Sequence, residues 1–99
     1  MQIQAAITAL GGYLPPDILT NADFERMVDT TDAWIKSRTG IETRHILKGE
    51  GLGTSDMAVE AVKELIAKRG IDPKEIELVI CATTTPDMQF PATANIICD

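Results

Sequence analysis

The strongest structural signal of the chain lies in residues 54–82, TSDMAVEAVKELIAKRGIDPKEIELVICA. The first half of this stretch repeats apolar residues with the 3.6-residue period of a helix, and charged residues occupy the other positions. Thr54 or Ser55 can cap the start of this helix, and Gly70 suits its end because glycine adopts the left-handed conformation of a C-cap. The predicted apolar stripe consists of Met57, Ala58, Ala61, Val62, Leu65 and Ile66.

A continuous apolar run at residues 78–82 follows this helix. Such a run predicts a strand that is covered on both faces, as in the parallel sheets of α/β proteins. Another strand is expected at residues 3–9, where apolar and more polar residues alternate until Gly11 and Gly12. The order strand, helix, strand indicates an α/β fold class.

Residues 21–39 predict a helix, a break and a second short helix. The available caps are Thr20 or Asn21 for the first helix, Thr30 or Thr31 for the second, and Gly40 at its end. The remaining expected elements are a turn or extended connection at 13–17, a short strand or hairpin arm at 41–46, a helical turn at 72–75 and a helix that starts at Pro91.

Composition and charge exclude several classes of protein. With 99 residues, of which 44% are hydrophobic, the chain fits at most one domain. The net charge of −6 argues against a surface that neutralises nucleic-acid phosphates. The apolar runs are too short to cross a bilayer, and the first residues do not form a secretion signal. We therefore expect a soluble, cytoplasmic protein that binds neither nucleic acid nor membranes.

The sequence lacks a complete set of catalytic residues. His45 is its single histidine, and we expect a structural or solvent-exposed role because a lone histidine cannot build a catalytic triad. Cys81 falls within an expected strand, where a thiol is a small buried apolar group rather than an activated nucleophile. Cys98 has no nearby cation that would activate it. The two cysteines form no CxxC pair, so we predict neither a zinc site nor a disulfide framework.

Trp34 and Arg38 lie one helical turn apart and form a more informative cluster. A tryptophan ring beside an arginine, with the hydroxyls of Thr30 and Thr39 nearby, offers a flat surface for an aromatic base and a cation for a phosphate. The alternative is structural: the tryptophan is half-buried over its own helix, and the arginine pairs with Asp32 or Glu42. The spacing alone does not choose between these two interpretations.

Several motifs follow one another along the chain: GYLP at 12–15, TNAD at 20–23, TDAWI at 31–35, RTGI at 38–41, RHI at 44–46, and ATTTPD at 82–87 followed by FPA at 90–92. In order and spacing they resemble the amino-terminal part of β-ketoacyl-acyl-carrier-protein synthase III. The resemblance covers essentially the whole chain, and the combination is far more specific than any single motif.

This resemblance implies the thiolase fold, a five-layer αβαβα sandwich of two similar halves, in an enzyme that forms a homodimer. Residues 1–99 would be the amino-terminal part of the first half. The enzyme would be an acyltransferase that condenses an acyl-CoA primer, expected to be acetyl-CoA, with malonyl-acyl-carrier protein to start fatty-acid biosynthesis. The CoA thioester would be a substrate, and no metal or redox cofactor would be needed.

The resemblance also assigns roles to individual residues. Trp34 would stack on the CoA adenine, with Thr30 and Arg38 at the nucleotide. Phe90 would reach toward the acyl pocket of the partner subunit and influence primer size, or it would fill space at the dimer interface.

The family's nucleophilic cysteine, its histidine and its asparagine match no position of this sequence. Neither Cys81 nor Cys98 precedes the small-residue turn that aims backbone amides at a thioester oxygen. We therefore expect an amino-terminal fragment that is inactive alone, from an enzyme that is active when complete. Two alternatives are a sister condensing enzyme of polyketide or secondary metabolism and a small, non-catalytic CoA-binding module.

Overall fold

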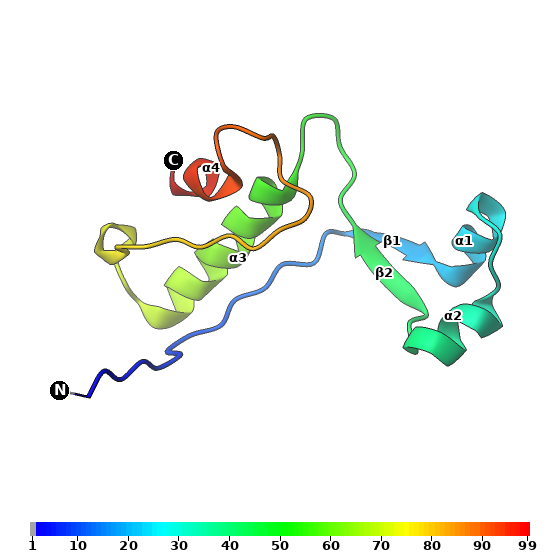
Figure 1. Ribbon diagram of the computed structural model, residues 1–99, viewed down its shortest axis with the longest axis horizontal. Helices are drawn as coiled ribbons and strands as arrows, with labels where there is room; N and C mark the ends of the chain where they lie inside the picture. The colour runs from blue at the N-terminus through cyan, green and yellow to red at the C-terminus, as the bar shows by residue number, and fades with distance from the viewer. Residues whose placement is uncertain (1) are drawn as a thin grey trace. The chain divides into compact units, whose positions relative to one another are not determined.

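The computed structural model describes residues 2–99, which divide into two compact units (Figure 1). Residues 14–50 form the first, here called the hairpin unit. Residues 2–13 and 51–99 form the second, here called the long-helix unit.

The hairpin unit contains two strands and two helices. Strands β1 (Asp17–Thr20) and β2 (Thr43–Ile46) pair antiparallel, and Asp17 lies opposite Ile46. The helices α1 (Asn21–Met27) and α2 (Asp32–Thr39) connect them. Strand β2 confirms the short strand expected at 41–46, whereas β1 was not predicted because Pro15 and Pro16 suggested a turn there.

Local side-chain caps explain why the two helices of the hairpin unit begin and end where they do. The Thr20 hydroxyl accepts a hydrogen bond from the Asp23 amide, and the Asp23 carboxylate accepts one from the Thr20 amide, which completes a capping box. The Thr31 hydroxyl caps α2 through the Trp34 amide at 3.1 Å. Gly40 ends α2 with a φ of 72°. The predicted helix, break and short helix are confirmed.

The long-helix unit is built on α3 (Thr54–Arg69), followed by the single 3₁₀ turn η1 (Pro73–Glu75) and by α4 (Thr93–Cys98), which packs beside α3 (Figure 1). Gly70 ends α3 as predicted. The predicted start was wrong, since Gly53 is the N-cap and its amide donates to the Asp56 carboxylate at 2.7 Å. Helix α4 begins at Thr93, two residues later than predicted.

The two strands predicted at 3–9 and 78–82 are not formed in the part of the chain that the structure describes. A strand needs a hydrogen-bonded neighbour. Among residues 2–99 the sheet consists of β1 and β2, so neither predicted segment has a strand to pair with. Leu78 is 75% exposed and Ile80 82% exposed, whereas Val79 and Cys81 are partly covered. The expectation that this run is covered on both faces was therefore wrong for this chain.

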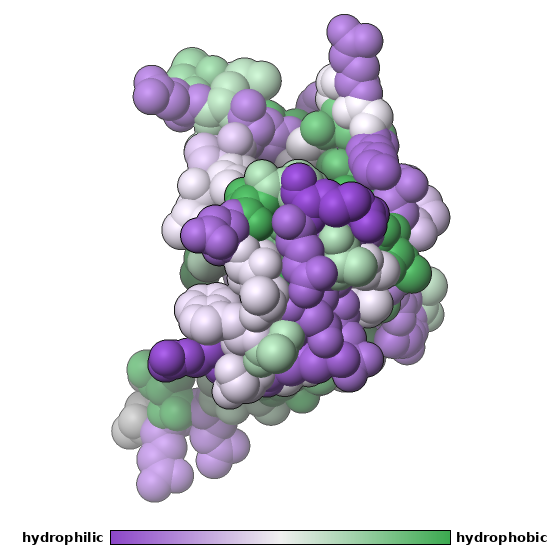
Figure 2. Space-filling model, turned by 90° about the vertical axis from the view of Figure 1, so that its right-hand side faces the viewer, coloured by the Kyte–Doolittle hydropathy of each residue, from purple (hydrophilic) through white to green (hydrophobic). Residues whose placement is uncertain are grey.

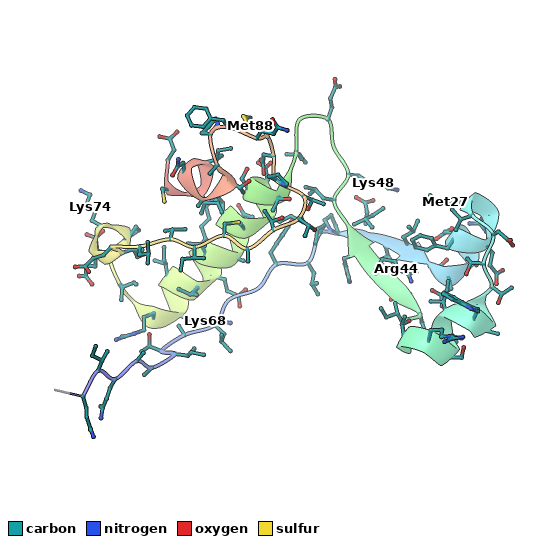
Figure 3. The ribbon with its side chains drawn as sticks, in the orientation of Figure 1. Met27, Arg44, Lys48, Lys68, Lys74 and Met88 are labelled. Atoms are coloured by element: carbon teal, nitrogen blue, oxygen red, sulfur yellow. The ribbon has the colours of Figure 1, made fainter. Side chains whose placement is uncertain are left out.

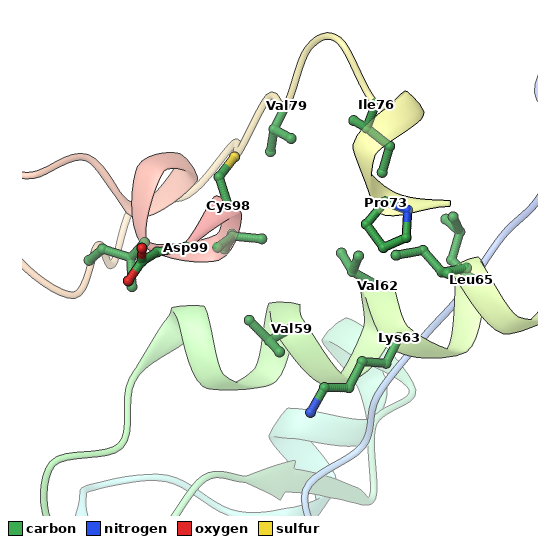
Figure 4. Close-up of a pocket in the computed structure, with 12 residues that line it drawn as sticks. Val59, Val62, Lys63, Leu65, Pro73, Ile76, Val79, Cys98 and Asp99 are labelled. Carbon is green, nitrogen blue, oxygen red and sulfur yellow. The ribbon is translucent and has the colours of Figure 1, made fainter. Parts of the chain in front are cut away.

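The apolar stripe of α3 faces the interior of the long-helix unit. Val62, Leu65 and Ile66 line a space of about 530 Å³, and Val79 and Cys98 lie across it from α3 (Figure 4). On the face shown in Figure 2, hydrophilic and hydrophobic side chains lie interspersed. Within residues 2–99, no helix combines the length and the apolar character that crossing a membrane requires.

Candidate functional site

Helix α2 presents Trp34 and Arg38 together at the surface. The Trp34 side chain is 58% exposed, although aromatic rings are usually more covered. The guanidinium carbon of Arg38 lies 5.8 Å from the centre of the indole ring, within the range of a cation–π contact. The sequence prediction that these two side chains are neighbours is confirmed, and one indole face is accompanied by a positive charge.

The structural alternative for Arg38, an ion pair with Asp32 or Glu42, is wrong. Lys36 occupies both carboxylates instead, with its Nζ 3.1 Å from Asp32 Oδ2 and 3.4 Å from Glu42 Oε1. With the residues that the structure describes, Arg38 forms no ion pair. Its guanidinium is therefore available to an external anion such as a phosphate.

A shallow hollow of about 270 Å³ adjoins the tryptophan, lined by Asp29, Thr30, Thr31 and Trp34. The structure thus brings the predicted residue Thr30 next to Trp34. Asp29 was not predicted as part of a site. Because a carboxylate only accepts hydrogen bonds, Asp29 suits an amino or hydroxyl group of a ligand rather than a phosphate.

The buried side-chain amide of Asn21 holds the start of α2 in place. The Asn21 side chain is 2% exposed and donates from Nδ2 to Asp32 Oδ1 at 2.8 Å. This hydrogen bond, followed by the one from Lys36, holds the pKa of the Asp32 carboxyl below its ordinary value. The sequence offered Asn21 only as a possible cap, because its partners lie far along the chain and leave no local pattern.

Phe90 lies in the long-helix unit and is 87% exposed. The segment before it is tied to the start of α3, where Asp87 Oδ1 accepts from the Ser55 amide at 2.8 Å and Thr54 donates to the Thr85 carbonyl at 2.6 Å. The hydrogen bonds from the Ser55 hydroxyl and then the Ser55 amide lower the pKa of Asp87. The loop is thus anchored while the phenyl ring stays uncovered.

The remaining candidates of the sequence form no catalytic group. The His45 Nδ1 lies 2.6 Å from the Pro15 carbonyl oxygen, which gives the ring a structural contact. Cys81 is half-buried and Cys98 is exposed, and both thiols are free. Across residues 2–99, no three His, Cys, Asp or Glu side chains are arranged to hold a metal ion.

Comparison with known proteins connects this geometry to a family. No family model matches the chain. The chain is 56% identical over 98 residues to the β-ketoacyl-[acyl-carrier-protein] synthase III 2 of Bacteroides thetaiotaomicron. This match covers 99% of the chain and 29% of the relative. The chain is homologous to β-ketoacyl-[acyl-carrier-protein] synthase III.

Solved structures agree with this assignment. The crystal structure of 3-oxoacyl-[acyl-carrier-protein] synthase III from Aquifex aeolicus matches with a TM-score of 0.81 and 44% identity, over 91% of this chain and 29% of that one. The priming β-ketosynthase of the R1128 polyketide pathway matches with a TM-score of 0.80 and 31% identity, over 91% of this chain and 27% of that one.

The predicted fold class is confirmed as α/β, part of the thiolase-like fold of β-ketoacyl-acyl-carrier-protein synthase III. The chain spans about 29% of the length of the curated relatives, which agrees with the prediction of a fragment. The Trp34 cluster lies on helix α2 within the part of the chain that these solved structures match in fold.

Proposed function

We propose that this chain is the CoA-binding part of a β-ketoacyl-acyl-carrier-protein synthase III. The complete enzyme condenses an acyl-CoA primer, acetyl-CoA in the first instance, with malonyl-acyl-carrier protein to start fatty-acid biosynthesis. The observation that carries this proposal is the exposed Trp34 ring with Arg38 at 5.8 Å, in a chain that is 56% identical to such a synthase.

Each residue of the cluster has a distinct part in holding the nucleotide. Trp34 stacks on the adenine, because a flat exposed ring offers area to a base at little entropic cost. Arg38, which has no ion pair with the described residues, pairs with a phosphate of CoA. Thr30 lines the adjoining hollow and offers a hydroxyl to the same ligand.

Phe90 has a separate part in the proposal, at the acyl end of the primer. An uncovered aromatic ring on an anchored loop suits a wall of an apolar pocket, and a homodimer partner would complete that pocket. The CoA thioester is a substrate, no metal or redox cofactor takes part, and the acyl-cysteine forms on a residue outside this chain. The two free cysteines suit the reducing cytoplasm, where we place the enzyme.

The condensation itself tests the proposal. The full-length gene product that carries this sequence is incubated with acetyl-CoA and malonyl-acyl-carrier protein, and mass spectrometry follows the carrier protein. We expect acetoacetyl-carrier protein to accumulate. Failure with every acyl-CoA tried would contradict the proposal, and a gene that encodes only a CoA-binding protein of this length would establish the non-catalytic module instead.

A polyketide enzyme is the second candidate, because the R1128 priming β-ketosynthase shares the fold at a TM-score of 0.80. Its 31% identity is lower than the 44% of the Aquifex aeolicus synthase, which favours the fatty-acid enzyme. Comparing acetyl-CoA with longer and branched acyl-CoA primers separates the two. A strong preference for an unusual primer would support the polyketide candidate.

A further inference from the structure

We propose that Asn21 is a positioning residue of the nucleotide site, which holds both ends of the helix that presents Trp34 and Arg38. The inference rests on the proposed function, because the role that it assigns is in binding the CoA nucleotide. Asn21 is the first residue of α1 and does not itself face the hollow beside Trp34.

The contacts of Asn21 join the beginning and the end of α2. Its Nδ2 donates to Asp32 Oδ1 at 2.8 Å, in the first turn of the helix. The same Nδ2 donates to the Ile41 carbonyl at 2.8 Å, one residue beyond the Gly40 cap. Both ends of α2 are therefore fixed to one amide group that is 2% exposed.

The other polar atoms of Asn21 fix the amide in turn. Its Oδ1 accepts from Arg44 Nη1 at 2.9 Å, and its backbone amide donates to the Glu42 carbonyl at 3.1 Å. Arg44, labelled in Figure 3, also stacks at 4.4 Å over the Phe24 ring of α1. The side-chain orientation of Asn21 is thus set by strand β2 and by α1, outside the helix that it positions.

Asparagine is the residue that this position requires, because the site uses two donated hydrogen bonds and one accepted bond on a single planar group. Aspartate has the same size but no donor. It would keep the hydrogen bond from Arg44, but it would place a second carboxylate beside Asp32 and turn an acceptor oxygen toward the Ile41 carbonyl. Buried polar groups that lose their partners are strongly disfavoured, so α2 would shift to relieve them.

A shift of α2 changes nucleotide binding more than chemistry. The helix has eight residues and carries Trp34 on its exposed side, where no covering layer within the hairpin unit holds the ring in place. The acyl-transfer groups of the proposed enzyme lie outside this chain. Loss of the Asn21 contacts therefore raises the KM for the CoA primer and leaves kcat nearly unchanged.

The test uses Asn21→Asp in the full-length gene product, with acetyl-CoA as the varied substrate. We expect KM to rise about tenfold, as for the loss of about one buried hydrogen bond, while kcat stays within about twofold. The double variant N21D/D32N restores a hydrogen bond of reversed direction and should recover part of the loss. Asn95→Asp makes the same chemical change at an exposed residue of α4 and should leave KM unchanged.

A lower kcat with an unchanged KM would show a merely structural role and overturn the inference. If Asn21→Asp does not fold, Asp32→Ala removes the Asn21 contact at the start of α2 together with the Lys36 ion pair and keeps the Ile41 contact, and an unchanged KM in that variant would also overturn the inference. Trp34→Ala separates this inference from the proposed function. An effect of Trp34→Ala without an effect of Asn21→Asp refutes only the role of Asn21, whereas no effect of Trp34→Ala refutes the nucleotide site itself.

Discussion

Gly11 lies against α3, and we predict that Gly11→Ala destabilises the protein. A Cβ atom at this position would lie 2.9 Å from both the Cβ and the amide nitrogen of Leu65, and it would also collide with the Ala61 carbonyl oxygen. Backbone atoms of a helix cannot move aside as the end of a flexible side chain can. Neighbouring contacts confirm the close approach, since the Gly12 amide donates to Glu64 Oε2 at 3.2 Å.

The expected magnitude follows from these clashes. Forcing an extra methyl group into a packed site costs about 1–3 kcal/mol, and a clash with helix backbone favours the upper part of that range. Gly12→Ala is the matched control, because a Cβ there meets nothing within 4 Å. Its effect should stay within about 0.5 kcal/mol, as for ordinary surface substitutions.

Calorimetry of the two variants in the full-length gene product measures the difference. Gly11→Ala should lower Tm by several degrees relative to Gly12→Ala, given that about 1 kcal/mol corresponds to roughly 2–4 °C in a protein of moderate size. Equal melting temperatures would refute the packing of residues 10–12 on α3.

Three further predictions concern pH, primer size and charge. The pKa values of Asp32 and Asp87 lie below the ordinary 3.8. The hydrogen bonds of these two carboxylates therefore stabilise the fold above that pH, and this stabilisation is lost as the pH falls through the lowered pKa values. Tm should decline in acid, and an unchanged Tm would contradict this. Phe90→Ala should raise kcat/KM for hexanoyl-CoA relative to acetyl-CoA, and an unaltered ratio would exclude Phe90 from the pocket. Arg38→Ala should raise KM for acetyl-CoA about tenfold and weaken its salt dependence, whereas wild-type salt dependence would remove Arg38 from the phosphate site.

The helices could be predicted because their signals are local. Thr20 and Asp23 form a capping box within four residues, and Gly40 and Gly70 adopt the positive φ that ends a helix. The predicted start of α3 was wrong. Ser55 was one of the two expected caps, but its hydroxyl donates at 2.5 Å to Asp87, a residue far along the chain. A distant acceptor displaced the local cap.

The strands were less predictable because a strand depends on its neighbour. The run at 78–82 has the composition of a central strand, yet Leu78 and Ile80 remain exposed in this chain. Conversely, residues 17–20 follow two prolines and still form a strand, because residues 43–46 pair with them. Composition alone contains no information about which partner is present.

The candidate site was predictable only where its contacts are local in the sequence. The spacing of Trp34 and Arg38 follows from helical periodicity, and the structure confirms their contact. The sequence left open whether Arg38 pairs with Asp32 or Glu42. In the structure Lys36 pairs with both carboxylates, and Arg38 pairs with neither. Asn21 was missed as a support because its hydrogen bonds reach Asp32, Ile41 and Arg44.

Calorimetric titration of CoA into the full-length gene product and its Trp34 variants tests the nucleotide site most directly. Stacking of a base on an aromatic ring contributes about 1–3 kcal/mol, so Trp34→Ala should raise the Kd for CoA at least fivefold, as roughly 1 kcal/mol implies. Trp34→Phe keeps a flat ring and should retain most of the affinity. A Kd that is the same in the wild type and in Trp34→Ala would contradict the assignment of this surface to CoA.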